Sequence, residues 1–327
     1  MTVFAPFPYF GGKRKIVSLV WPRLGADVPS YLEPFFGSGA MLFGRPGGAG
    51  KYETVNDIDG MVSNFFRAVR AQPDEVAYHA DYPINETDLH ARHRALVEAI
   101  PRVTMALEDP DYYDAKVAGW WCWGKSQWIG DGWCRHPEWK ARPDLAEQLP
   151  NISGNRGVHR KLPELHGNKG FHGNRAGGNP LVYEWMRALA ERLRFVRVCA
   201  GDWQRILSPS TLGTTRTGLE QGIAPSAVYL DPPYRGFAEL YASSDAGNVH
   251  DEVTAFCKKY GESPRVRIAL SGYENDYDLE GWEVVAWKAH GGYGNQSDEN
   301  ENAKKERIWL SPHCLKPSAQ ESLWDEA

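Results

Sequence analysis

The chain has 327 residues, of which 42% are hydrophobic and 24% are charged, as in an ordinary globular protein. No apolar run approaches the roughly 18 residues that a membrane-spanning helix needs, and the first residues lack the pattern of a secretory signal. The five cysteines are scattered, which argues against a disulfide framework and leads us to expect a cytoplasmic protein. The net charge of −5 argues only weakly against a nucleic-acid partner, because it hides local charge.

The first part of the chain has the pattern of an α/β domain. A turn with basic residues at its end is expected to lead into a helix over residues 16–24. A short strand from Tyr31 then enters a glycine loop, and a helix is expected around residues 41–43. A second strand over 52–57 precedes a helix over 61–70, where apolar residues recur at helical spacing.

The pattern changes near residue 73 and returns to α/β near residue 180. Residues 75–100 are expected to be helical with an interruption at Tyr82-Pro83, and the tryptophan-rich stretch 109–139 to be partly helical. Residues 151–180 show no periodicity and are rich in glycine, asparagine, histidine and arginine. We therefore expect a discontinuous α/β domain of residues 1–72 and 181–327, with residues 73–180 inserted into it.

Strands and helices alternate again after the insert. We expect helices over 181–193 and 249–260, strands over 195–199, 227–230, 266–271, 282–288 and 306–310, and a long loop from 203 to 225. The alternation predicts a Rossmann-like α/β fold with a largely parallel sheet.

The most informative sequence is Asp231-Pro232-Pro233-Tyr234, directly after the apolar run 227–230. Two prolines end the strand abruptly, because they donate no backbone hydrogen bond. A carboxylate is thereby held at the carboxyl end of a strand, where α/β sheets bind ligands. The carboxylate and the proline carbonyls can accept hydrogen bonds from an amine, and Tyr234 can stack on a flat base.

A second site is predicted at the glycine loop. Gly37 and Gly39 let the backbone turn tightly and approach a ligand, and Asp57 ends the next strand, where an acid can bind ribose hydroxyls. Leu42 occupies the position of the third glycine of the dinucleotide motif, which argues against a nicotinamide or flavin enzyme.

Four sequence blocks occur in a diagnostic order: Tyr9-Phe10-Gly11-Gly12-Lys13, Glu33-Pro34-Phe35-Phe36-Gly37-Ser38-Gly39, Asn56-Asp57 and Asp231-Pro232-Pro233-Tyr234. Together they resemble the Dam-type (D12 class, alpha group) DNA adenine-N6 methyltransferases, especially phage-borne members. The resemblance implies a Rossmann-like methyltransferase sheet, a mostly helical target-recognition insert and S-adenosylmethionine as cofactor. It also implies double-stranded DNA as substrate and a monomer in the cytoplasm of a bacterial or phage-infected cell.

By this resemblance, the cofactor-binding residues are Tyr9, Gly11, Gly12, Lys13, Glu33, Phe35, Gly37, Gly39, Asp57, Asp202 and Asp231. Lys13 could pair with the carboxylate of the cofactor, and Asp202 lies near the cofactor adenine in such enzymes. As a residue after a strand, Asp202 could equally cap a helix.

The catalytic residues implied are Asp231, Pro232 and Tyr234. Asp231 and the Pro232 carbonyl would each accept a hydrogen bond from the adenine amine and direct its lone pair at the methyl group. The amine is inaccessible inside a duplex, so the base must be flipped out and stacked on Tyr234.

The insert holds the candidate DNA contacts. The stretch from residue 151 to residue 197 contains nine basic residues and only three acidic ones. The expected DNA-binding residues are Lys125, Arg156, Arg160, Lys161, Lys169 and Arg175. Most of the clustered tryptophans are expected to form the core of a small subdomain. The spacing of Cys122, Cys134 and His136 matches no zinc pattern, so no metal is expected.

Two rivals remain open from the sequence. The same chemistry could act on cytosine N4 or on RNA adenine, since the proline motif also occurs in other amine methylases. Alternatively, the chain could be a non-catalytic DNA-binding protein on the same scaffold. The target sequence and the biological role, such as restriction–modification or protection of phage DNA, are not encoded in these motifs.

Overall fold

The computed structural model describes residues 5–7, 13, 16–128, 133–134, 180–233, 246–287 and 306–316. The chain divides into two compact units, which we call the helical unit and the sheet unit. The helical unit comprises Met1–Phe10, Asp59–Arg194 and Tyr293–Asn295, and the sheet unit comprises Gly11–Ile58, Phe195–Gly292 and Gln296–Ala327.

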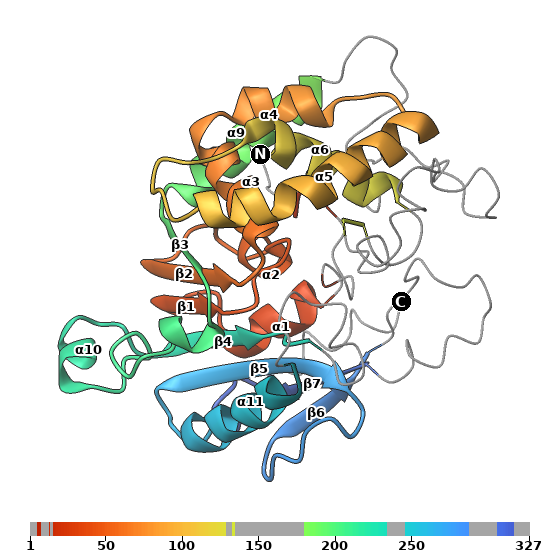
Figure 1. The fold of residues 1–327 in the computed structure, drawn as a ribbon. Helices are drawn as coiled ribbons and strands as arrows, with labels where there is room; N and C mark the ends of the chain where they lie inside the picture. Colours follow the sequence, from red (N-terminus) through yellow and green to blue (C-terminus); the bar gives the residue numbers. More distant parts are fainter. Residues whose placement is uncertain are drawn as a thin grey trace, which may run out of the picture. The chain divides into compact units, whose positions relative to one another are not determined.

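The sheet unit contains a seven-stranded sheet (Figure 1). Its strands are β1 (Ser30–Glu33), β2 (Tyr52–Asp57), β3 (Val196–Ala200), β4 (Ser226–Leu230), β5 (Val266–Tyr273), β6 (Glu283–Ala286) and β7 (Glu306–Leu310). Their order is β3-β2-β1-β4-β5-β7-β6. Strand β7 runs antiparallel to both of its neighbours, β5 and β6, and the other pairs are parallel. The Rossmann-like α/β fold predicted from the sequence is confirmed.

Burial along the strands follows their place in the sheet. Central β1 and β4 are buried at every residue, whereas the edge strands β3 and β6 are mostly exposed. Leu32 and Val228 lie in an apolar cluster with Val253 of α11 (Ala246–Tyr260). Tyr31 points to the opposite face, as successive strand residues must, and its ring packs 4.9 Å from that of Trp21 in α1 (Val17–Leu24). Helices therefore cover both faces of the central strands.

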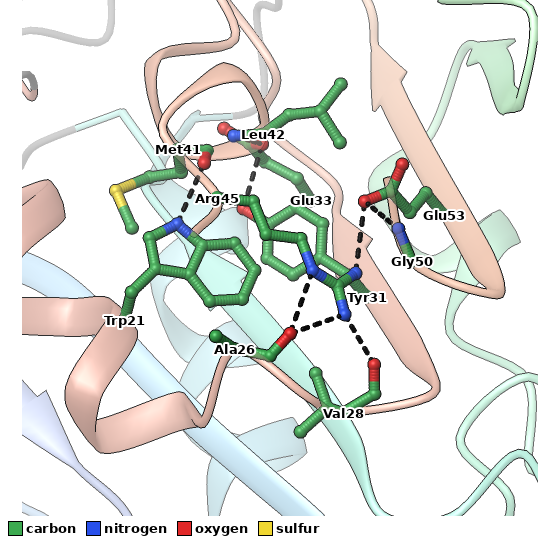
Figure 2. A network of polar contacts seen from close by, with 10 residues as sticks. All are labelled: Trp21, Ala26, Val28, Tyr31, Glu33, Met41, Leu42, Arg45, Gly50 and Glu53. Atoms are coloured by element: carbon green, nitrogen blue, oxygen red, sulfur yellow. Dashed lines mark hydrogen bonds and ion pairs between the residues drawn. The ribbon is translucent and has the colours of Figure 1, made fainter. Parts of the chain in front are cut away.

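The turn between α2 (Ala40–Phe43) and β2 is fixed by a buried ion pair, shown in Figure 2. Arg45 Nη1 lies 3.0 Å from Glu53 Oε1, and both side chains are almost fully buried. The guanidinium also donates to the carbonyls of Ala26 and Val28, so most of its hydrogen-bonding capacity is used. Glu53 Oε1 accepts a further bond from Gly50 N. The network ties the chain before β1 to the start of β2.

The segment from 203 to 225 differs from the sequence expectation of a loop. It contains a 3-10 helix, η2 (Trp203–Ile206), and the short helix α10 (Arg216–Glu220). The side chains of Asp202 and Thr215 cap them by accepting hydrogen bonds from Gln204 N and Gly218 N. Elements this short carry too few residues for a detectable apolar period, which is why the prediction missed them.

The helical unit is built from five helices in the described residues. They are α3 (Gly60–Ala71), α4 (Pro73–Ala80), α5 (Glu86–Ala106), α6 (Ala115–Gln127) and α9 (Pro180–Leu193). The break between α4 and α5 falls where the sequence predicted it, and Asn85 caps α5 through Thr87 N and Asp88 N. Helices α3 and α9 cluster with this unit, although the sequence placed them at the borders of the discontinuous α/β domain.

Tryptophans of α6 form part of the core of the helical unit. Trp121 and Trp123 are almost completely buried, and Trp121 meets Phe7 edge-on with ring centroids 4.8 Å apart. This agrees with the expectation that most of the clustered tryptophans serve packing. In the part of the chain that the structure describes, no helix has the length and apolar character needed to span a membrane.

Candidate active site

The site predicted from the sequence lies at the switch point of the sheet. From β1 the chain proceeds to β2 and β3 on one side, whereas β4 and β5 lie on the other side of β1. Strands β1 and β4 are parallel neighbours, with Leu32 beside Val228, so their carboxyl ends open at the same edge. Ligands of open α/β sheets bind at such a point, outside the carboxyl ends of the strands. The glycine loop follows β1 there, and Asp231 follows β4.

The glycine loop depends on left-handed backbone at two residues. Gly37 has φ 49° and Gly39 has φ 71°, which other residues adopt only with strain. A Cβ on Gly39 would also stand 2.6 Å from the rings of Phe36 and Phe43. Glycine is therefore required at residue 39 by both backbone conformation and packing.

The loop is pinned to the end of β2. Gly37 N donates to Asp57 Oδ2 over 2.7 Å, and Phe36 N donates to the Asn56 carbonyl over 2.9 Å. Asp57 is half-buried, so its carboxylate lines the loop while part of it stays accessible. The two residues predicted to act together on a cofactor, Gly37 and Asp57, are thus in direct contact.

Asn56 belongs to the sequence block Asn56-Asp57, but sequence reasoning gave it no role of its own. Its Nδ2 donates to the carbonyls of Pro34 and Gly201, over 3.2 and 2.9 Å. These carbonyls follow β1 and β3, while Asn56 lies in β2 between them. One buried amide therefore joins the ends of three strands. In the sequence, the only sign of this role was that Asn56 directly precedes Asp57.

The aromatic residue of the loop packs toward β3. Phe35 stacks on Trp203 with ring centroids 5.5 Å apart and an interplanar angle of 26°. Asp202, just before Trp203, is exposed and accepts a hydrogen bond from Gln204 N over 2.9 Å. The capping role considered for Asp202 from the sequence is therefore present, and its carboxylate stands at the carboxyl end of β3.

Glu33 is enclosed rather than open to the site. It accepts hydrogen bonds from Tyr31 Oη over 2.9 Å and from Leu42 N over 3.2 Å, as Figure 2 shows. Burial raises the pKa of Glu33 well above 4.5, and the charges of Asp231 and Asp57 raise it further, while the two hydrogen bonds oppose the shift. The carboxyl groups of Asp231 and Asp57 are thus near enough to Glu33 to influence its ionisation.

The elbow after β4 is held by an ion pair that the sequence did not predict. Lys13 Nζ lies 3.0 Å from Asp231 Oδ1 and 3.9 Å from Glu306 Oε2. The Lys13 side chain is 8% exposed and that of Asp231 is 18% exposed, so the pair is largely shielded from water. Pro232 and Pro233 are buried. Lys13 thereby links the first glycine-lysine block of the sequence to the proline motif.

A comparison with protein-family models gives one family for this region. Residues 9–103 match the model of the D12 class N6 adenine-specific DNA methyltransferase. The match includes Lys13, the glycine loop and Asp57 in the order that the sequence analysis used. The resemblance to the D12 class is confirmed. A search of curated proteins found no significant match.

The residues present fit the cofactor that D12-class enzymes generally use. S-adenosylmethionine carries a positively charged sulfonium and ammonium group, a ribose with two hydroxyls and an adenine. Asp57, Asp231 and Asp202 stand at the ends of β2, β4 and β3, where their carboxylates can attract the cations and accept hydrogen bonds from hydroxyls and amines. These three carboxylates at the carboxyl edge of the sheet favour a cationic ligand over a negatively charged phosphate.

Several predicted site residues are not placed. Tyr9, Gly11, Gly12, Tyr234, Arg156, Arg160, Lys161, Lys169 and Arg175 lie outside the described residues. Lys125 is described: it is half-buried in α6, and its ammonium stands 4.9 Å from the ring centroid of Trp121. Among the residues that the structure describes, no three His, Cys, Asp or Glu side chains are grouped as metal ligands would be.

Proposed function

We propose that this protein transfers a methyl group from S-adenosylmethionine to N6 of an adenine in DNA. The observation that carries the proposal is the elbow Asp231-Pro232-Pro233, which follows β4 at the switch point beside the glycine loop of β1. The D12-class match over residues 9–103 supports the choice of adenine N6.

Asp231 has the chemistry that the reaction needs. The lone pair of an adenine amine is delocalised into the ring, so the amine is a weak nucleophile. A carboxylate and a carbonyl that accept hydrogen bonds from its two N–H groups favour a tetrahedral nitrogen and stabilise the positive charge that develops on it. Asp231 would accept one N–H bond and the Pro232 carbonyl the other. Bound S-adenosylmethionine would supply the electrophilic methyl group.

The cofactor would lie across the ends of β1, β2 and β3. We assign the ribose to Asp57, the adenine end to Asp202 and the methionine end to the block of Tyr9, Gly11, Gly12 and Lys13, with Phe35, Gly37 and Gly39 forming the loop beneath it. Glu33 would act through the loop, because its carboxyl oxygen Oε2 bonds to Leu42 N and Tyr31 Oη.

The ion pair of Lys13 and Asp231 gives Lys13 a second role beside the cofactor carboxylate. A cation 3.0 Å from the carboxylate offsets the cost of burying it and fixes the orientation of Oδ1. Asp231 would therefore be preorganised to accept a hydrogen bond from an entering amine.

DNA recognition would belong to the inserted residues 73–180. The base would be flipped out of the duplex and stacked on Tyr234, while basic residues of the insert neutralise phosphates and read base edges. We propose double-stranded DNA as the substrate, methylated either at a specific target sequence or with relaxed specificity, and a monomer as the acting species.

The test is methyl transfer by the purified protein from radiolabelled S-adenosylmethionine to unmethylated DNA. Asp231→Ala should reduce labelling on the order of a hundredfold or more, while circular dichroism shows a retained fold. Asp278→Ala, which removes an exposed carboxylate of the same sheet unit, should label DNA normally. Equal rates for the two variants would refute the role given to Asp231.

A further inference from the structure

His250 lies directly behind the proline elbow. It belongs to α11, is 1% exposed, and its Nε2 stands 3.0 Å from the carbonyl oxygen of Pro233. Neither the sequence motifs nor the matched segment 9–103 includes this residue. It contacts the motif from a helix whose first residue is thirteen positions beyond Pro233 in the sequence.

The direction of this hydrogen bond follows from the partner. A carbonyl oxygen can only accept, so Nε2 must carry the proton. Proline has no backbone N–H, and Pro232 and Pro233 therefore cannot fix the elbow by donating hydrogen bonds of their own. The acceptors of the elbow are contacted in the described part of the chain by Lys13, at Asp231, and by His250, at Pro233.

The imidazole is itself held by the core of the sheet unit. Its ring stacks on Tyr277 with centroids 5.0 Å apart and an interplanar angle of 17°. Tyr277 in turn meets Trp309 of β7 edge-on, with centroids 5.2 Å apart. Tyr277 and Trp309 belong to the apolar cluster that packs β4 against α11. The His250 ring, which donates the hydrogen bond, is thus fixed by packing against the core of the sheet unit.

We infer that His250 is a positioning residue for methyl transfer, which rests on the function proposed above. The Pro233 carbonyl is one half of the planar peptide bond to Tyr234, so a donor that fixes the carbonyl also fixes the plane from which Tyr234 leaves. The same hydrogen bond holds Pro233 in place. Pro233 directly follows Pro232, and the Pro232 carbonyl is the group proposed to accept a hydrogen bond from the adenine amine. His250 thereby sets the geometry of both groups without touching the substrate.

The kinetic test compares two substitutions at His250 with a matched control. His250→Phe keeps a ring for Tyr277 and removes the donor, whereas His250→Gln retains an N–H near the position of Nε2. His313→Phe removes the same kind of bond elsewhere in the unit, since His313 Nε2 lies 3.0 Å from the Glu262 carbonyl on an exposed surface. All three variants and the wild type are assayed for kcat, for KM with DNA and for calorimetric affinity toward S-adenosylmethionine.

We expect His250→Phe to lower kcat about tenfold or more with cofactor affinity nearly unchanged, because a buried carbonyl loses its donor and the elbow loses its fixed geometry. His250→Gln should recover most of kcat, and His313→Phe should match the wild type. If His250→Phe and His313→Phe have the same kcat, the inference is overturned. A role in stability alone would lower the melting temperature of His250→Phe without a specific loss of kcat.

A second measurement does not depend on activity. Nitrogen-15 spectra of the wild type labelled at its ten histidines report which ring nitrogen carries the proton, and the His250→Gln spectrum identifies the signal of His250. A neutral ring protonated at Nε2, with slow exchange, supports the contact; a bare Nε2 overturns it. Absence of methyl transfer by the wild type would refute the proposed function, and the spectrum would still decide whether His250 holds the elbow.

Discussion

Glu33 belongs to a motif of the candidate site, yet its side chain points into the protein interior. It stands between β1 and the glycine loop, and its carboxyl group bonds to Tyr31 and Leu42 within the sheet unit. The sequence could place Glu33 beside the glycine loop but could not reveal the direction of its side chain, because that direction depends on a tyrosine two residues earlier and a backbone N–H nine residues later. The proximity of Glu33 to a cofactor stays a prediction, and its burial gives it a structural role.

Burial of Glu33 predicts a dependence of stability on pH. The pKa of Glu33 is raised above 4.5 in the folded state, so the folded protein holds a proton that the unfolded chain releases. The contribution is fully present below about pH 4.5 and is lost as pH rises toward the raised pKa. Glu33→Gln should therefore gain stability relative to the wild type as pH increases above 4.5, by up to about 1.4 kcal/mol per pH unit.

The measurement is the free energy of unfolding in urea at a series of pH values. Glu283→Gln serves as the control of opposite sign, because hydrogen bonding to Arg23 lowers the pKa of Glu283. Its carboxylate stabilises the fold above pH 4.5 and loses that effect as pH falls through the lowered pKa, so the variant should be at a disadvantage only at higher pH. A pH-independent difference between Glu33→Gln and the wild type would contradict the burial of an ionisable group at residue 33.

At the scale of elements, the turns between strands carry the site, and they differ in how far sequence predicts them. The elbow after β4 follows from two prolines, and the glycine loop follows from Gly37 and Gly39, whose backbone other residues adopt only with strain. The contacts that fix these turns, Lys13 to Asp231, Asn56 to Pro34 and His250 to Pro233, join residues distant in the chain. No local pattern encodes such pairs, so only the structure brings them together.

The turn between α2 and β2 gives a prediction about stability. Arg45→Met would leave Glu53 as a buried charge and would remove the donor from the carbonyls of Ala26 and Val28. We expect a loss of about 3–5 kcal/mol in the free energy of unfolding. Arg23→Met, which breaks the more exposed pair with Glu283, should lose about 1 kcal/mol or less.

Both values come from urea denaturation of the two single variants and the wild type. A double variant, Arg45→Met with Glu53→Leu, should recover part of the loss, because the unpaired charge is then gone. Equal losses for Arg45→Met and Arg23→Met would show that the buried network does not stabilise the turn.

At the scale of the whole molecule, the sequence order of the strands and the change of pattern near residues 73 and 180 were enough to predict the fold class. The position of β7 between β5 and β6 was not predictable from periodicity, because pairing of strands depends on register and crossover rather than on local pattern. The compact units divide at 59 and 194, since α3 and α9 pack with the helices of the insert. The border between the two units is thus set by helix packing and not by the change in sequence pattern.

The proposed role of the insert predicts how DNA binding depends on salt. Arg160→Ser with Lys161→Ser should weaken DNA binding and reduce the slope of log K against log salt by about 0.9 for each phosphate that is no longer neutralised. Affinity for S-adenosylmethionine should stay the same, because none of the proposed cofactor residues lies between residues 151 and 180. The matched control is Lys258→Ser with Lys259→Ser, an adjacent exposed pair in the last turn of α11.

Fluorescence anisotropy with a labelled duplex at several salt concentrations gives both the affinity and the slope. The control pair should leave the slope unchanged. Identical slopes for the two double variants would remove Arg160 and Lys161 from the DNA-binding surface and direct the search to another part of the chain.

The central claim, methylation of adenine at N6 through Asp231, is tested most directly by identifying the modified nucleoside. DNA from a host without adenine methylation is incubated with S-adenosylmethionine and the wild type or Asp231→Ala, digested to nucleosides and analysed by mass spectrometry. The account predicts N6-methyladenine with the wild type and none above background with Asp231→Ala. Methylcytosine as the product, or N6-methyladenine formed equally by both proteins, would contradict it.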